Sequence, residues 1–140
     1  MDVGLRDVIE EDFRFLFELR NSAGVRKHMF NENEIEWDEH VDYWKKRIAE
    51  KRPSHIIMHM NERAGMVKLD WDVNEKCYYV SIIVSGGFQG KGVGKGALEA
   101  LKARFPGSRM RAKVKPGNKA SIGLFEAAGF GLRCIEYELK

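Results

Sequence analysis

The sequence contains little cysteine and proline, and it has no long apolar run. Two cysteines, Cys77 and Cys134, cannot form a scaffold of several disulfides, and without CxxC spacing they do not indicate a zinc or redox site. We expect both to be buried packing residues. No stretch approaches the roughly 20 apolar residues that span a bilayer, and no signal-peptide apolar region follows Met1. These absences predict a cytoplasmic protein without a membrane partner.

Internal repeats, low-complexity segments and linkers rich in Pro, Gly or Ser are also lacking. A chain of 140 residues that is 44% hydrophobic can bury one core, which excludes disordered and collagen-like classes. We therefore expect a single domain over residues 1–140, with one site.

Acidic residues are scarce in one segment. From Phe88 to Ala120 there are nine basic residues against the lone Glu99, although the whole chain has a formal net charge of only +3. Such a segment is typical of a site for a polyanion. Nucleic acid is not the expected partner, because the segment has no zinc finger, RNP-type aromatic pair or basic zipper.

Apolar periodicity predicts alternating strands and helices. The expected strands cover residues 3–8, 56–60, 65–71, 77–84, 110–114 and 134–139, and the expected helices cover residues 10–20, 37–50, 93–105 and 118–128. Strands 65–71 and 77–84 are separated by turn residues and favour an antiparallel hairpin. This order of elements indicates an α/β or α+β fold with a largely antiparallel sheet.

The segment from Gln89 to Gly96 is rich in glycine, follows an apolar strand and opens an amphipathic helix. Glycine lets the backbone approach a ligand closely, and the first turn of a helix offers amide groups with no internal acceptor. Aimed at a pyrophosphate, these amides and the helix dipole form an anion site, which Lys91 and Lys95 strengthen.

Two common phosphate-binding patterns do not fit this segment. A Walker loop needs a leading glycine where Gln89 stands, and Ser or Thr where Gly96 follows the lysine. A Rossmann loop needs a different spacing of its third glycine and an acidic residue about 20 positions later, but residues 105–115 contain none. A nucleoside triphosphatase and a dinucleotide-binding enzyme are therefore disfavoured.

Two motifs resemble those of the GCN5-related N-acetyltransferase (GNAT) superfamily. Gln89-x-x-Gly92-x-Gly94 after a strand resembles the pattern [RQ]-x-x-G-x-[GA], and the segment Asn118 to Phe130 resembles N-x-x-A-x-x-L-Y-E-x-x-G-F. The order of the two motifs and the 24-residue step from Gly94 to Asn118 make the pair more specific than either motif alone. The likeness extends over nearly the whole chain.

The resemblance implies a GNAT fold, with a mixed, mostly antiparallel sheet that splays after its fourth strand and about four flanking helices. It implies acetyl-CoA as cosubstrate and no metal. By this resemblance, the backbone of Ile82, Ile83 and Val84 pairs with the pantetheine arm. The pyrophosphate is held by backbone amides of Gln89, Gly90, Lys91, Gly92, Val93, Gly94 and Lys95. The same cleft is lined by Asn118, Ser121 and Phe125.

The chemistry that the resemblance implies is direct attack of a neutral amine on the thioester, with a backbone amide near Ile83 or Val84 stabilising the oxyanion. The chain departs from the family at two positions. Phe125 stands where many members have a tyrosine that protonates the thiolate, and Tyr79 stands where many have a glutamate base. Proton transfer must then involve other groups or water, or the protein is a weak catalyst or a non-catalytic acyl-CoA-binding module.

Several other side chains are candidates for proton transfer. Asp70 and Asp72, which share a strand face, and His40 are candidate bases, and the candidate donors are Tyr79, Ser121 and Tyr137. His55 and His59 do not indicate a metal site, because an HExxH motif needs Glu where Ile56 stands and a strand does not bring the pair together.

The acceptor is predicted only by resemblance. The segment from Leu19 to Phe30, followed by Ile35 and Glu39-His40, resembles enzymes that acetylate amino-sugar nucleotides, notably in pseudaminic acid biosynthesis. It is also similar to ribosomal-protein N-terminal acetyltransferases, although residues 65–70 and 80–84 resemble the sugar-nucleotide subgroup more. The implied partner is a small-molecule amine, and both a monomer and a homodimer remain open.

Overall fold

The computed structural model describes residues 2–140 and contains one five-stranded sheet in the order β1-β2-β3-β4-β5. The strands are β1 Val3–Asp7, β2 Ser54–His59, β3 Glu62–Asp72, β4 Cys77–Val84 and β5 Met110–Arg111. The first three pairings are antiparallel, and β4 pairs with β5 in parallel. The α/β fold class and the hairpin of β3 with β4 are therefore confirmed.

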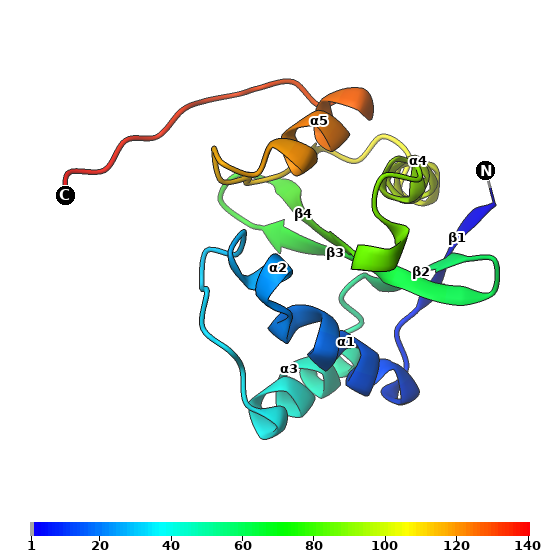
Figure 1. Cartoon of the computed structure of the whole chain (residues 1–140). Helices are drawn as coiled ribbons and strands as arrows, with labels where there is room; N and C mark the ends of the chain where they lie inside the picture. The colour runs from blue at the N-terminus through cyan, green and yellow to red at the C-terminus, as the bar shows by residue number, and fades with distance from the viewer. Residues whose placement is uncertain (1) are drawn as a thin grey trace.

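Helices cover both faces of this sheet (Figure 1). One face carries η1 Glu10–Asp12, α1 Phe13–Asn21, α2 Ala23–Arg26 and α3 Trp37–Ala49, and the other carries α4 Val93–Arg104 and α5 Lys119–Ala127. The short η2, Gly86–Phe88, connects β4 to the glycine-rich loop. The sequence did not predict α2, which is a single turn.

Each face of the sheet has its own apolar core. Ile57, Val67 and Leu69 pack with α4 and with Phe125 of α5, whereas Ile56 and Met66 pack with α1 and with Trp44 of α3. Alternate residues of one strand point to opposite faces, so β2 and β3 contribute to both cores. The two layers of helices are thereby fixed on either side of β4.

Strand β3 approaches β4 very closely at Gly65, which lies opposite Val84. A Cβ atom at residue 65 would lie 2.2 Å from the carbonyl oxygen of Ile83, so only glycine fits this position. The close approach places the C-terminal end of β4 directly against β3, just before the chain turns into η2.

The sheet opens between β4 and β5. These strands pair only at Tyr78 with Met110 and at Tyr79 with Arg111, so the rest of β4 has no neighbouring strand on this edge in the described chain. The expected strand over residues 110–114 is thus limited to two residues. The opening confirms the predicted splay and leaves the backbone of residues 82–84 accessible from this side.

Two expectations for the C-terminal part are wrong. Residues 134–139 form no strand, and the whole of residues 131–140 is exposed and runs away from the body of the protein (Figure 1). A strand requires hydrogen bonds from a neighbour, and none lies beside this segment within residues 2–140. For the same reason Cys134 is exposed, although Cys77 is buried as expected.

No helix of the described residues has the length and apolar character needed to cross a membrane.

A candidate acyl-transfer cavity

A cavity of about 1300 Å³ opens where β4 and β5 separate. Its floor is the exposed end of β4, including Ile82, Ile83 and Val84, and its walls come from α1, the segment between α2 and α3, α3 itself, the glycine-rich loop and α5. One continuous space therefore reaches both layers of helices.

The N-terminus of α4 forms one end of the cavity. Gly90 and Gly92 have φ angles of 76° and 77°, a left-handed conformation that glycine adopts without strain. No backbone amide from Gly90 to Lys95 donates to a backbone carbonyl within residues 2–140. These free amides, together with the positive end of the helix dipole, make an anion site that fits a diphosphate.

Nearly all the residues expected to bind the cofactor line this cavity. They are Ile82, Ile83, Val84, Gln89, Gly90, Gly92, Val93, Gly94, Lys95, Asn118, Ser121 and Phe125. Lys91 is the exception, since it is not part of the lining and its ammonium lies 5.9 Å from the centre of the Phe88 ring. The roles of these residues toward a ligand stay predictions.

Helix α5 presents its first turn to the same space. The side-chain oxygen of Asn118 accepts a hydrogen bond from the amide of Ser121 at 3.2 Å, which makes Asn118 the N-cap of α5. Phe125 is buried and packs edge-to-face on Phe130, with ring centres 5.1 Å apart. Its ring closes the end of the cavity but supplies no proton.

The other end of the cavity is a chamber that the sequence did not predict. Tyr43 and Trp44 of α3 form part of its wall. Met66 and Lys68 of β3, which lie opposite Ile83 and Ser81 of β4, form part of its floor. The alternation of Met66 and Lys68 could have indicated that both side chains share one face of the sheet. The contribution of α3 had no sequence signal, because it depends on how the helix packs.

Positive charge dominates this lining. The cations are Arg20, Lys27, Lys68, Lys95 and Lys113, whereas Glu39 is the single carboxylate among the described lining residues. None of the five cations forms an ion pair with a carboxylate of residues 2–140. The cavity therefore attracts a ligand with negative charge.

Local contacts hold some of these cations in place. The ammonium of Lys68 donates to the hydroxyl of Tyr43, and that of Lys113 lies 4.8 Å from the centre of the Tyr79 ring. The guanidinium of Arg20 donates to two backbone carbonyls of the α2–α3 loop, and burial together with nearby Arg26 lowers the pKa of Arg20.

Two groups of contacts fix the loop that covers the chamber, residues 27–36. Asn21 exchanges two hydrogen bonds with the backbone of Ile35, at 2.9 and 3.1 Å. Lys115, which follows β5, lies 3.0 Å from the carboxylate of Glu32 and donates to the carbonyl of Lys27 at 3.5 Å. The loop is thus attached to both α1 and the segment after β5, on opposite sides of the cavity.

Three of the candidates for proton transfer line the cavity, namely Tyr79, Ser121 and His40. The Tyr79 and Ser121 side chains are half-buried. His40 is buried among aromatic rings, and burial lowers its pKa despite a hydrogen bond to the carbonyl of Phe13. His40 is therefore neutral at physiological pH.

The other three candidates lie elsewhere. Asp70 accepts hydrogen bonds from Arg47 at 2.5 Å and Arg52 at 2.6 Å, and Asp72 accepts from two amides of the following turn. Burial raises the pKa of Asp70, but the bond from Arg47 and the neighbouring positive charges outweigh it and hold that pKa below its usual range. Tyr137 is 90% exposed on the C-terminal segment. The structure brings none of these three side chains to the cavity.

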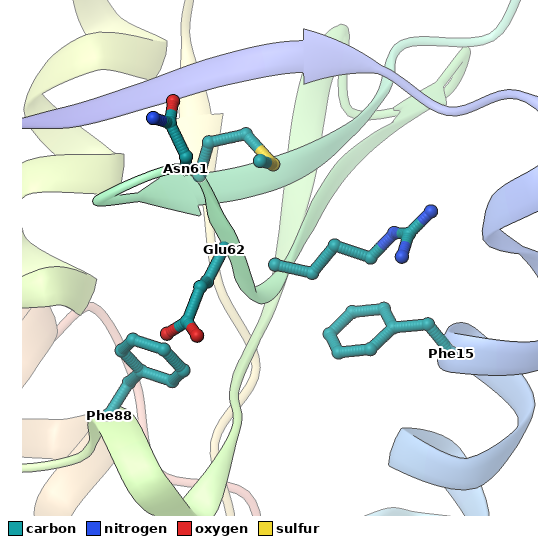
Figure 2. A pocket seen from close by; sticks show the side chains of 6 residues that line it. Phe15, Asn61, Glu62 and Phe88 are labelled. Carbon is teal, nitrogen blue, oxygen red and sulfur yellow. The ribbon is translucent and has the colours of Figure 1, made fainter.

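A smaller hollow of about 570 Å³ lies on the far side of η2. Figure 2 shows Phe15 of α1 and Phe88 of η2 on opposite sides of it, with Glu62 directed toward Phe88. Arg63, which also lines it, donates to the buried Asp12 at 2.8 Å. The guanidinium of Arg63 thus takes part in a structural contact.

No group of three or more His, Cys, Asp or Glu side chains that could hold a metal ion is found in the part of the chain that the structure describes.

Comparison with known proteins decides the family. The model of the acetyltransferase (GNAT) family matches residues 10–130, which include both halves of the cavity. The chain belongs to this family. A relative from Bacillus subtilis (strain 168), the uncharacterized N-acetyltransferase YfmK, is 30% identical over 101 residues, which cover 69% of this chain and 67% of the relative. The protein is therefore an acetyltransferase.

Solved structures of two other acetyltransferases have the same fold. YncA from Salmonella typhimurium, a structure with acetyl-CoA, superposes with a TM-score of 0.76 at 23% identity, covering 93% of this chain and 80% of that one. The ribosomal L7/L12 alpha-N-protein acetyltransferase RimL, a complex with coenzyme A, has a TM-score of 0.81 at 21% identity, covering 94% and 81%. At these identities the likeness concerns the fold.

Proposed function

We propose that the protein transfers the acetyl group of acetyl-CoA directly to the primary amine of a small, negatively charged acceptor, and that this acceptor is a nucleotide-linked amino sugar. The observation that carries the proposal is the continuity of the cavity. It joins a helix N-terminus that suits a diphosphate to a chamber lined by aromatic rings and unpaired cations. Both reactants can therefore meet over the exposed end of β4.

Bound acetyl-CoA would supply the thioester carbonyl that the amine attacks. On the protein side, the amides from Gly90 to Lys95 hold the diphosphate, and the edge of β4 at residues 82–84, which has no neighbouring strand, bonds the pantetheine amides. Asn118 and Ser121 complete this end from α5. The complexes of YncA with acetyl-CoA and of RimL with coenzyme A support this assignment.

Charge selects the acceptor. Lys27, Lys68 and Lys113 line the chamber without a carboxylate partner in residues 2–140. An anionic ligand group therefore gains more binding free energy there than a neutral group does. A polyamine would meet repulsion from the same side chains. A sugar attached to a nucleoside diphosphate combines a primary amine with the negative charge that this lining favours.

Proton transfer is assigned to groups that line the cavity. Tyr79 replaces the glutamate of many relatives, and we assign to it and to Ser121 the return of a proton to the thiolate. The attacking amine loses its proton through water. The backbone amide of Val84 stabilises the oxyanion, because it faces the open edge of β4, whereas the amide of Ile83 faces β3.

The absence of a hydroxyl at Phe125 favours a second candidate, a non-catalytic acyl-CoA-binding module. A third candidate, acetylation of a protein N-terminus, is supported by the sequence Arg20-Asn21 and by the fold shared with RimL. The three candidates differ in the acceptor that releases free thiol.

Two measurements test the proposal. Thermal shifts with CoA, acetyl-CoA, NAD and ATP test the cofactor end, because a ligand that binds only the folded protein raises its melting temperature. Thiol release is then followed with a nucleoside-diphosphate-linked amino sugar, the same sugar without the nucleotide, and a peptide N-terminus. We expect a shift with CoA and acetyl-CoA alone, and the fastest turnover with the linked sugar. Turnover only with the peptide would refute the sugar acceptor.

A further inference from the structure

The smaller hollow, of about 570 Å³, has the composition of a ligand site, although the proposed acyl transfer does not use it. Ligand sites of roughly 300–1000 Å³ combine apolar walls with a few polar groups. Phe15 and Phe88 lie on opposite sides of the hollow, and Met58 contributes a third apolar side chain (Figure 2). All three are half-buried, so a ligand between them is shielded by apolar groups and can still enter from solvent.

Glu62 supplies an unpaired negative charge at one wall of the hollow. Figure 2 shows its side chain directed toward the Phe88 ring. The Lys91 ammonium and the His59 ring lie 5.9 and 6.0 Å from the centre of that ring, but neither forms an ion pair with Glu62 within residues 2–140. An ammonium group bound here would contact both a free carboxylate and an aromatic ring.

Arg63 supplies a positive charge at the opposite wall. Its Nε donates to Asp12 at 2.8 Å, and Arg6 donates to both oxygens of the same carboxylate at 2.7 and 2.8 Å. One carboxylate thus faces two guanidinium groups, which leaves a surplus positive charge. The two Nη groups of Arg63 donate to no other residue of the described chain. Paired donors of this kind suit a ligand carboxylate.

The turn between β2 and β3 holds polar side chains beside the hollow in a strained conformation. Met60 and Asn61 have φ angles of 52° and 63°, in the left-handed region that a two-residue type I′ hairpin turn uses. Asparagine tolerates this region, but methionine adopts it only at an energetic cost. Non-glycine residues held in this way cluster at ligand clamps. The turn therefore supports a binding role for Asn61 and Glu62, which line the hollow.

We propose that the hollow binds a small zwitterion, a molecule with an ammonium group, a carboxylate and an apolar body, and that its occupancy strengthens ligand binding in the acyl-transfer cavity. The ammonium lies between Glu62 and the Phe88 ring, and the carboxylate accepts from the Nη groups of Arg63. The apolar body fills the space beside Phe15 and Met58. A free apolar amino acid and a short apolar peptide share this chemistry.

Phe88 connects the hollow to the acyl-transfer cavity, because its side chain lines both. It belongs to η2, where a Cβ atom added at Gly86 or Gly87 would meet no other atom within 4 Å, so little packing holds this turn. A ligand that fixes Phe88 removes part of the ordering cost for a ligand on the other side, which is positive coupling. This second part rests on the proposed function, because it takes CoA as the ligand of the cavity.

Calorimetry in the absence of acetyl-CoA tests the site, with leucine and leucyl-leucine as probes. We expect at least one of them to bind, and the tighter probe identifies the source of the zwitterion. Its amide lacks the carboxylate and its N-acetyl form lacks the ammonium group, so each should bind at least tenfold more weakly. No binding of either probe at millimolar concentration would overturn the proposal.

Two matched variants assign the probe to the hollow. Glu62→Gln should raise the dissociation constant of the tighter probe about tenfold. Glu39→Gln, which neutralises the carboxylate in the lining of the acyl-transfer cavity, should leave this constant unchanged. The far-ultraviolet spectrum of each variant confirms folding. Sensitivity to Glu39→Gln in place of Glu62→Gln would put the probe in the cavity and overturn the site.

Methionine-methyl NMR gives the location without any substitution. Met58 lines the hollow and Met29 lines the acyl-transfer cavity, so the probe should shift the signal of Met58 and not that of Met29. The reverse pattern would contradict the site.

Titration of CoA with and without a saturating concentration of the tighter probe tests the coupling. We expect the dissociation constant of CoA to fall at least threefold when the probe is bound. Equal constants would reject the coupling. A protein that binds the probe but never CoA would contradict the proposed function and the coupling that rests on it, while the zwitterion site would stand.

Discussion

His40 donates a hydrogen bond from Nε2 to the carbonyl oxygen of Phe13 at 2.8 Å, and this bond joins α3 to the first turn of α1. The ring stacks on Trp37, with centres 5.7 Å apart, and its edges meet Phe17 and Trp44. Its Nδ1 is buried and has no partner within the described residues. His40 therefore fixes the wall of the chamber, and it does so in the neutral form.

The buried neutral imidazole predicts a loss of stability in acid. Burial lowers the pKa of His40 below the ordinary value of about 6.5, so the unfolded chain binds more protons between the two pKa values. The free energy of unfolding should fall as the pH drops through 6.5 and level off below the folded pKa. His40→Gln keeps a donor for the Phe13 carbonyl but cannot titrate.

Urea unfolding of the wild type and of His40→Gln from pH 8 to pH 5 measures this effect. We expect a smaller fall for the variant, but not a flat profile, because burial also lowers the pKa of His55. Identical slopes in both proteins would mean that His40 titrates normally.

Asp70 has a structural role that its neighbours define. Arg47 is completely buried and places its guanidinium on Asp70, on Ser54 and on backbone carbonyls. Asp70→Asn should lower the free energy of unfolding by about 1–3 kcal/mol, because a charged hydrogen bond is lost at a buried cation. The kcat of the folded variant should be unchanged.

The exposed Asp42→Asn on α3 serves as the control and should change neither quantity. A fall in kcat of about 100-fold for Asp70→Asn with stability retained is what a general base would give, and it would contradict the structural role.

Sequence alone could predict whatever depended on local pattern. The helix at residues 37–50 and the hairpin of β3 and β4 were both found because apolar spacing and turn residues act over a few positions. The segment 134–139 has an equally clear pattern and yet forms no strand, because pairing depends on a neighbour that is distant in sequence.

The candidate site could likewise be predicted only where it depends on local pattern. The glycine-rich loop was found because φ angles near +77° at Gly92 require glycine, and a motif preserves that requirement. The burial of His40 and the ion pair of Asp70 depend on how α3 packs on the sheet, so these residues were proposed as bases with no sign of their partners. Tyr43 and Trp44 were missed for the same reason.

The anion site at α4 predicts that charge at residue 92 controls coenzyme A binding. Asp and Asn have the same shape and both tolerate the left-handed conformation of Gly92, so Gly92→Asp and Gly92→Asn should lose similar stability. Only the aspartate repels a phosphate. Isothermal titration should give a dissociation constant for CoA about tenfold higher for the Asp variant than for the Asn variant.

Gly123→Glu on α5 adds a negative charge where a Cβ meets nothing within 4 Å, and it is the control for net charge. Equal CoA affinities for the two residue-92 variants would place the diphosphate elsewhere.

Lys68 is predicted to bind the anionic group of the acceptor. Lys68→Met keeps the aliphatic chain but removes the charge, so the KM for a negatively charged acceptor should rise about tenfold, the loss of one charged hydrogen bond, with little change in kcat. A neutral amine should be used as before. Steady-state thiol release with the two acceptors measures both parameters.

Lys46→Met removes an exposed positive charge from α3 outside the cavity, and it should leave both KM values as they are. A parallel rise in KM for the neutral amine in Lys68→Met would indicate a change of cavity shape instead of lost charge.

The missing side chain at Gly65 determines how tightly the floor beneath the reacting groups is held. A single methyl group there would push Ile83 and Val84 away from the sheet from behind, since its place lies 2.2 Å from the Ile83 carbonyl oxygen. In the proposed function, the alignment of the two substrates thus depends on a residue that neither of them touches. Enzyme variants selected for a new acceptor should accordingly change the chamber walls and keep this glycine.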